Sequence, residues 1–244
     1  MALRPSAAAN GTDKQGSTAI SHGSQEKQKQ LLASDTGHFS MIKALHLADL
    51  ITELNGFCGF MSIISSMRYC LGPPDAYAPI WAALAFMPFG LFFDFMDGKV
   101  ARWRKKSSLM GQELDSLADL ISFGVSPAAC AFALGLRSAI DTLLLSFFVL
   151  CGLTRLARFN VTVSALPKDA TGKSKYFEGT PIPTSLAIVA GMAWCVSQGT
   201  VNGGEHGVLG GTLGQGILEF HPIVGIFVGW GCAMVSKSIH IPKP

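Results

Sequence analysis

Six stretches of apolar residues constrain the fold of this chain more than any other feature of its sequence. Only 14% of its 244 residues are charged, whereas soluble domains carry about 25%. A helix that crosses a bilayer needs about 17–25 apolar residues, and the shorter stretches reach that length only with their flanking residues or in a locally thinner membrane. We therefore predict an all-α integral membrane protein with six transmembrane helices. The stretches are Asn55–Cys70, Ala76–Phe95, Leu114–Leu134, Ile140–Leu153, Ile182–Val196 and Gly216–Val235.

The segments around these stretches suggest four regions. Residues 1–36 are rich in Ala, Ser, Gly and Gln without apolar periodicity, which predicts a disordered cytosolic tail. Residues 37–53 place apolar side chains at helical spacing between polar ones, which is typical of an amphipathic helix at the membrane surface. Residues 54–238 would then form the six-helix domain, and residues 239–244 a short C-terminal tail.

Basic residues gather after the second, fourth and sixth stretches. Lysine and arginine are enriched in cytoplasmic loops, so with six spans this face and both termini are predicted to lie in the cytosol. The formal charge of +3 and the lack of a basic patch interleaved with aromatic residues argue against a nucleic-acid partner. The basic residues are Lys99, Arg102, Arg104, Lys105, Lys106, Arg155, Arg158, Lys168, Lys173, Lys175, Lys237 and Lys243.

Four aspartates stand at the ends of two neighbouring stretches. Asp94 and Asp97 close the second stretch, and Asp115 and Asp119 open the third. On helices, residues three or four apart share one face, so the two helix ends would direct four carboxylates into one small volume. Their mutual repulsion is relieved by cations. Oxygen ligands without His or Cys favour Mg²⁺ or Mn²⁺, and four carboxylates suit a pair of ions that serves phosphoryl chemistry.

The residues between the two pairs are consistent with a phosphate ligand. Gly98 and Ala101 leave space beside Asp97, Arg102 offers a planar set of donors, and Ser108 offers a hydroxyl. Solvated helix caps would explain one or two of the aspartates. Four of them at membrane helix ends are costly, which favours the functional interpretation.

The whole pattern Asp94-x2-Asp97-Gly98-x2-Ala101-Arg102-x8-Gly111-x3-Asp115-x3-Asp119 resembles the signature of the CDP-alcohol phosphotransferases at every fixed position. Members of this family are six-helix membrane enzymes, usually dimeric, that transfer a phosphatidyl or phospho-alcohol group and release CMP. The resemblance implies that Asp94, Asp97 and Asp115 hold metal, while Asp119 lies near the second ion and acts as general base.

The same resemblance implies a site for the nucleotide. Gly98, Ala101, Arg102 and Ser108 would line the pocket for cytidine diphosphate. Thr52 and Asn55 occupy the place where family members contact the nucleotide, although their alternative role is to cap the first span.

Three further segments resemble the phosphatidylserine synthases within this family, and the polar N-terminal tail resembles that of fungal members. The resemblance covers Ala48–Gln198 and implies CDP-diacylglycerol and L-serine as substrates. We predict a homodimer in the membrane of the endoplasmic reticulum. The segments are LNGFCGF (Leu54–Phe60), LTRLARFNV (Leu153–Val161) and KYFEGTPIPTSLA (Lys175–Ala187).

A serine substrate needs a cation for its carboxylate and an acceptor for its ammonium group. Arg155 and Arg158 lie on one helical face, beside Phe159 and Asn160, and an arginine grips a carboxylate through two parallel hydrogen bonds. Glu178, or backbone carbonyls just after it, would accept from the ammonium group. The alternative for the two arginines is the ordinary bias of basic residues toward the cytosol.

Two other functions remain compatible with the sequence. A sister enzyme would use another alcohol, such as inositol or glycerol phosphate, with the same aspartate signature. A metal-ion transporter would need acidic residues at several depths of the membrane, whereas the four aspartates gather at one face.

Overall fold

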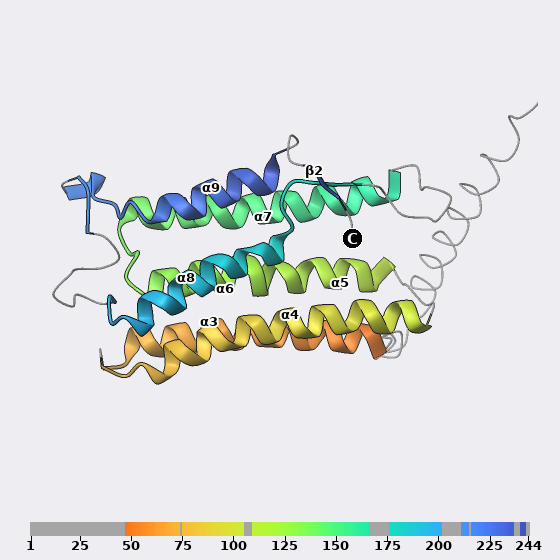
Figure 1. Cartoon of the computed structure of the whole chain (residues 1–244), viewed down its shortest axis with the longest axis horizontal. Coiled ribbons are helices and arrows are strands. Elements are labelled where there is room, and N and C mark those ends of the chain that lie inside the picture. The colour runs from red at the N-terminus through yellow and green to blue at the C-terminus, as the bar shows by residue number, and fades with distance from the viewer. Residues whose placement is uncertain are drawn as a thin grey trace, which may run out of the picture. The chain divides into compact units, whose positions relative to one another are not determined.

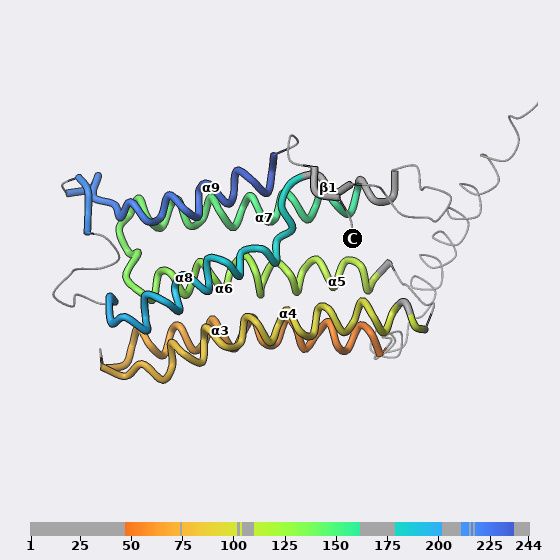
Figure 2. The backbone as a smooth tube through the Cα atoms, in the orientation of Figure 1, coloured from red at the N-terminus to blue at the C-terminus, as the bar shows by residue number. Residues whose placement is uncertain are grey.

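Each of the six apolar stretches contains a helix (Figures 1 and 2), although the α-helix of the sixth, Gly216–Val235, begins only at Val224. The computed structural model describes residues 47–73, 75–104, 109–165, 176–201, 211–214, 216–236 and 240–242. All of these residues belong to one compact unit, His46–Pro244. The predicted tail, and residues 37–46 of the predicted surface helix, lie outside the described residues.

Within the described part of the chain, four helices are long and apolar enough to cross a membrane, by their length and composition. Their qualifying portions comprise 25, 24, 24 and 23 residues, which at 1.5 Å per residue exceed the bilayer core of about 30 Å. The third helix is built from three consecutive segments. The elements are α3 (Leu47–Leu71), α4 (Ala78–Arg104), α5 (Leu109–Asp119) with η1 (Leu120–Val125) and α6 (Ser126–Ala133), and α7 (Ala139–Ala165).

The fifth and sixth stretches form shorter helices, α8 (Leu186–Ser197) and α9 (Val224–Val235), of 12 residues each. Each measures about 18 Å along its axis. A 3₁₀ turn, η2 (Ile182–Ser185), leads into α8, and another, η3 (Gly216–Leu218), precedes α9.

Two short strands, β1 (Tyr176–Glu178) and β2 (His240–Pro242), pair antiparallel. Tyr176 lies opposite Pro242, and Glu178 opposite His240. The pairing brings the segment before α8 beside the C-terminal end of the chain, where the sequence predicted only a short tail.

Helix α3 extends further toward the N-terminus than the first apolar stretch. Residues 47–53, which we expected to lie on the membrane surface, form the first turns of α3 and continue directly into Asn55–Cys70. The reason is local, because no glycine or proline interrupts the chain between Leu47 and Asn55.

The helices bury a common core and expose an apolar exterior. Helix α3 packs along α4, and α7 packs along α9, where the rings of Phe148 and Phe227 meet edge to face at 5.4 Å. Large apolar side chains also cover the outside, as lipid contact requires. The exposed group includes Phe57, Phe60, Phe89, Phe92, Leu143, Leu150 and Trp194.

The third helix contains a π turn at η1, directly after Asp119. The backbone N–H of Ser126 donates to the carbonyl of Ile121, five residues earlier. Phe123 O has no α-helical donor, because Pro127, four residues later, lacks an N–H, and it accepts a hydrogen bond of 2.7 Å from Ser185 Oγ. The π turn thereby connects the third helix to the turn before α8.

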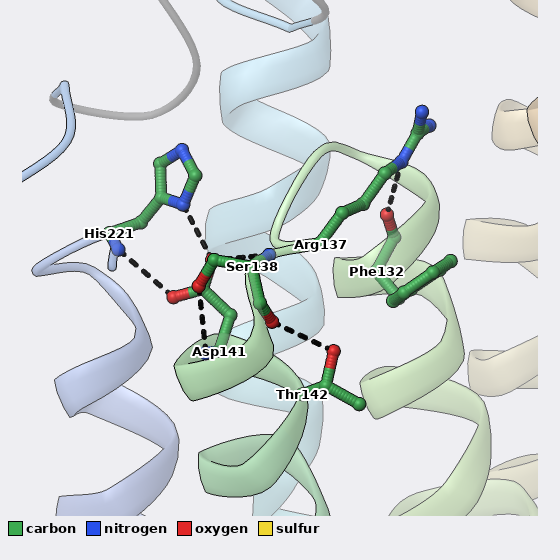
Figure 3. A network of polar contacts seen from close by, with 6 residues as sticks. All are labelled: Phe132, Arg137, Ser138, Asp141, Thr142 and His221. Atoms are coloured by element: carbon green, nitrogen blue, oxygen red, sulfur yellow. Dashed lines mark hydrogen bonds and ion pairs between the residues drawn. The ribbon is translucent and has the colours of Figure 1, made fainter. Parts of the chain in front are cut away.

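A second polar network lies at the start of α7 (Figure 3). Ser138 and Asp141 exchange hydrogen bonds in the reciprocal pattern of a capping box. The fully buried Asp141 also accepts from the backbone N–H of His221 at 2.9 Å, and lies 2.6 Å from its Nδ1. Since a carboxylate only accepts, Nδ1 carries the proton. The network fixes the segment before α9 to the start of α7.

Candidate active site

Three of the four aspartates converge where the end of α4 meets α5. One carboxylate oxygen from each of Asp94, Asp97 and Asp115 lies within 4.8 Å of the other two. We call these three residues the carboxylate cluster. Asp97 is buried, and the other two are half-buried. The sequence predicted that all four aspartates would converge, and the structure brings these three together.

The cluster fits a hard divalent cation by its chemistry. All of its ligand atoms are oxygens, the donors that Mg²⁺ and Mn²⁺ prefer. Asp115 Oδ1 is buried and has no hydrogen-bond partner. A buried carboxylate oxygen without a donor is costly, and a cation would remove that cost.

Asp119 ends α5, one turn after Asp115, and does not belong to the three-residue cluster. Its Oδ1 accepts a hydrogen bond of 3.2 Å from Asn55 Nδ2 on α3. It also lies within electrostatic range of the Arg155 guanidinium on α7. Asp119 therefore accepts a hydrogen bond from the Asn55 amide and lies near the positive charge of Arg155.

Helix α3 directs two polar side chains toward these carboxylates. Thr52 Oγ1 lies 2.6 Å from Asp97 Oδ2 and 3.1 Å from the carbonyl of Ala48. Asn55, three residues later on the same face, contacts Asp119 as described above. Both residues are buried.

The other residues assigned to the nucleotide lie at the C-terminal end of α4 or beyond it. Gly98 and Ala101 are half-buried in its last turns, next to Asp97. Arg102 belongs to α4 by its backbone, and its side chain lies outside the described part of the structure. Ser108 lies outside the described residues.

Helix α7 brings Arg155 to the site. Its side chain is buried, with only 7% exposed, and its Nε is a buried donor without a hydrogen-bond partner. Arg158, one turn later, is half-buried and donates from Nη1 to the carbonyl of Val235 at 3.4 Å, at the end of α9.

Asn160 forms a bridge between α7 and α5. Its Nδ2 donates to Glu113 Oε2, and its Oδ1 accepts from Ser116 Oγ, both at 3.0 Å. Phe159 is half-buried beside it. Glu178 lies in β1, and its side chain is outside the described part of the structure.

The model of one protein family, CDP-alcohol phosphatidyltransferase, matches residues 45–230 of the chain. The chain belongs to the CDP-alcohol phosphatidyltransferase family. The match includes α3 to α8, most of α9 and all four aspartates. The carboxylate cluster therefore lies within the part of the chain that defines this family.

Curated members of the family resemble the chain to different degrees. The CDP-diacylglycerol–serine O-phosphatidyltransferase of Saccharomyces cerevisiae is 58% identical over 88% of this chain and 77% of its own length. The Bacillus subtilis protein of the same name is 36% identical over 63% of this chain and 75% of its own. The archaetidylserine synthase of Methanothermobacter thermautotrophicus is 35% identical over 59% of this chain and 56% of its own.

Sequence reasoning missed several residues that shape this family site. Glu113 and Ser116 hold Asn160, and Gly90 on α4 gives space to Asn55, because a Cβ at Gly90 would lie 2.8 Å from Asn55 Oδ1. Residues in these contacts are 35 to 47 positions apart in sequence. No local spacing signals such contacts. A polar residue inside an apolar stretch, such as Asn55, is the one signal the sequence offers.

Proposed function

We propose that the chain is a phosphatidylserine synthase, which transfers the phosphatidyl group of CDP-diacylglycerol to the hydroxyl of L-serine and releases CMP. One observation carries this proposal: the 58% identity to the yeast serine O-phosphatidyltransferase over 88% of the chain. The convergence of Asp94, Asp97 and Asp115 supports it, because the diphosphate of the donor lipid needs neutralisation where it is cleaved.

The reaction exchanges one phosphorus–oxygen bond for another. The serine hydroxyl oxygen attacks the phosphorus that carries diacylglycerol, while Asp119 takes the hydroxyl proton. The bond from this phosphorus to the bridging oxygen breaks, and that oxygen leaves with CMP. Asp119 then releases its proton to solvent. The acyl chains stay in the bilayer, beside the exposed apolar side chains of the helices.

Divalent cations fit this site as cofactors. Asp94, Asp97 and Asp115 would hold Mn²⁺ or Mg²⁺, with Asp119 beside a second ion. Bound there, the ions would neutralise the charge on the diphosphate and on the leaving CMP. Asn55 and Arg155 keep Asp119 close to the cluster.

The nucleotide would lie along the last turns of α4. Gly98 and Ala101 carry no bulky side chain, so a diphosphate can approach the helix backbone there. We assign Arg102 and Ser108 to the same site as donors to phosphate.

Serine would be bound beside Arg155. Its buried Nε has no partner, and its guanidinium lies within electrostatic range of Asp119, the proposed base. Bidentate binding of the serine carboxylate would satisfy the guanidinium and place the hydroxyl near Asp119. Arg158, Phe159 and Asn160 continue this face of α7, and Glu178 is assigned to the ammonium group.

We further propose six membrane spans, with the active site and both termini in the cytosol. The four long helices support four of the spans. The remaining two, Ile182–Ser197 and Val224–Val235, are shorter and would require a locally thin bilayer. A homodimer in the membrane of the endoplasmic reticulum completes the proposal.

A head-group panel tests the function. Purified protein in lipid micelles receives labelled CDP-diacylglycerol with L-serine, inositol or glycerol phosphate, and both CMP and the lipid product are measured. We expect CMP release to require serine and the product to be phosphatidylserine. Release with inositol or glycerol phosphate, but not with serine, would assign the chain to a sister enzyme of the family.

A further inference from the structure

We propose that Thr52 and Asn55 are positioning residues for two carboxylates rather than ligands of the nucleotide. Thr52 would orient Asp97 in the carboxylate cluster, and Asn55 would orient Asp119. The inference rests on the proposed function for the roles of the two aspartates. It assigns to α3 the task of fixing carboxylates that are carried by two other helices, α4 and α5.

The hydroxyl of Thr52 is committed to the cluster. Its side chain is 4% exposed, and its single proton has two acceptors, Asp97 Oδ2 at 2.6 Å and the Ala48 carbonyl at 3.1 Å. The contact with the carboxylate is the shorter one, as charge-assisted hydrogen bonds are. It restrains rotation of the Asp97 carboxylate.

The side-chain amide of Asn55 is restrained on two sides, and its backbone carbonyl has a partner as well. Only its NH₂ group can donate to Asp119 Oδ1, at 3.2 Å, which determines the orientation of the amide. Its Oδ1 faces α4 at Gly90, where a Cβ would lie 2.8 Å away. Its backbone carbonyl accepts from Ser122 Oγ of the π turn at 2.9 Å.

Burial argues against direct contact with the nucleotide. Asn55 is 0% exposed and Thr52 is 4% exposed, so neither presents surface to a ligand. The one unpartnered atom, Asn55 Oδ1, faces the backbone of α4. Both polar side chains therefore act on substrate only through the aspartates they contact.

The first test measures Mn²⁺ binding to the purified protein in detergent by titration calorimetry, without substrate. Residues that orient metal ligands typically contribute about 10–100-fold to affinity. We expect Thr52→Val to weaken Mn²⁺ binding by about tenfold or more, and Thr52→Ser to restore it. Ser62→Ala is the matched control, because Ser62 is a buried residue of α3 whose hydroxyl donates to Ala83 O at 2.8 Å, away from the cluster.

The second test separates kcat from KM at Asn55. Asn55→Leu removes the donor and keeps the branched shape of the side chain, and Gly90→Ala displaces the amide without changing its chemistry. Because a misplacement of about 1 Å costs up to about 10²-fold, we expect both variants to lower kcat by about 10–100-fold. The KM for CDP-diacylglycerol and the affinity for CMP would stay within about threefold of wild type.

The outcomes distinguish the inference from the proposed function. If wild-type protein binds no Mn²⁺, the proposed metal site fails, and the inference fails with it. If wild type binds Mn²⁺ and Thr52→Val binds it equally well, the role of Thr52 is overturned alone. If Asn55→Leu raises the KM for CDP-diacylglycerol and weakens CMP binding at unchanged kcat, Asn55 contacts the nucleotide and its positioning role is overturned.

Discussion

Asp119 is the residue on which the proposed chemistry depends most. Two neighbours hold it, since Asn55 donates to one of its oxygens and Arg155 lies within electrostatic range. Asp119 also lies within electrostatic range of Asp94, Asp115 and Asp97, so the four carboxylates share one site. We propose three of them as ligands for cations and Asp119 as the acceptor of the proton from the attacking hydroxyl.

Replacing Asp119 by Asn removes the proposed base at constant shape. We expect kcat to fall by at least about 10²–10⁴-fold, the usual contribution of a general base. The thermal midpoint in detergent and the affinity for CMP should remain near those of wild type. Near-normal serine incorporation by the variant would show that another group takes the proton.

Replacing Arg155 by Lys keeps the charge and removes the planar set of donors. We expect the KM for serine to rise by about tenfold or more, with little change in the KM for CDP-diacylglycerol, because lysine cannot bind a carboxylate in bidentate fashion. Arg137→Lys is the control, since Arg137 donates to carbonyls at the end of α6. An unchanged KM for serine in Arg155→Lys would contradict the assignment.

For single residues, the sequence predicted which side chains belong to the site better than it predicted which side chains contact one another. The spacing of Asp94, Asp97 and Asp115 predicted their convergence, because helical periodicity places such residues on one face. The bridge from Asn160 to Glu113 and Ser116 was not predictable in the same way. It depends on the rotation of α7 against α5, which is set by packing of the whole helix.

At the scale of elements, the third helix and its π turn determine how closely α3 approaches the site. At Gly59 a Cβ would lie 2.6 Å from Ser122 Oγ and 2.9 Å from Ser122 Cα. Ser126 Oγ lies 2.9 Å from the Gly59 carbonyl and 2.8 Å from the Ile121 carbonyl. Close packing at one glycine thus holds α3, with Thr52 and Asn55, against the helix that carries Asp115 and Asp119.

Gly59→Ala should disturb this approach. The added methyl group meets backbone as well as side-chain atoms of Ser122, so we expect a loss of about 1–3 kcal/mol in stability. Thermal unfolding in detergent measures the effect. Gly191→Ala on α8 is the control, because a Cβ there meets nothing within 4 Å. Equal thermal midpoints for the two variants would exclude a tight contact at Gly59.

The sequence predicted the helices themselves well, since each of the six apolar stretches contains a helix, although in the sixth the α-helix begins only at Val224. It did not predict the π turn. Leu120–Val125 is at least as apolar as the α-helical segments around it, and two carbonyls of the turn accept from the hydroxyls of Ser126 and of the distant Ser185. The number of membrane-spanning helices remains a prediction for α8 and α9.

At the scale of the whole described unit, polar networks occupy both ends of α7. Arg155 belongs to the site, whereas Asp141, about 21 Å away along the helix axis, belongs to the network with His221 (Figure 3). This second network was not predictable from the sequence, because its partners Asp141 and His221 are 80 residues apart. One end of α7 therefore carries a network that stabilises the fold, and the other end carries a residue of the site.

Asp141→Asn should therefore destabilise the protein without altering the reaction. The variant weakens acceptance from His221 and Ser138 in a fully buried place, which we expect to cost about 1–3 kcal/mol. Thr142→Ala removes an exposed hydrogen bond of the same network and serves as control. A lower kcat per folded molecule of Asp141→Asn would contradict this separation.

The most direct test measures the incorporation of labelled serine into lipid with and without divalent ions. Purified protein is treated with EDTA, desalted and supplied with CDP-diacylglycerol and labelled L-serine, and Mn²⁺ or Mg²⁺ is then added back. We expect no phosphatidylserine from the metal-free protein and recovery of synthesis, with equal release of CMP, when either ion is restored. Synthesis of phosphatidylserine at the full rate by the metal-free protein would contradict this expectation.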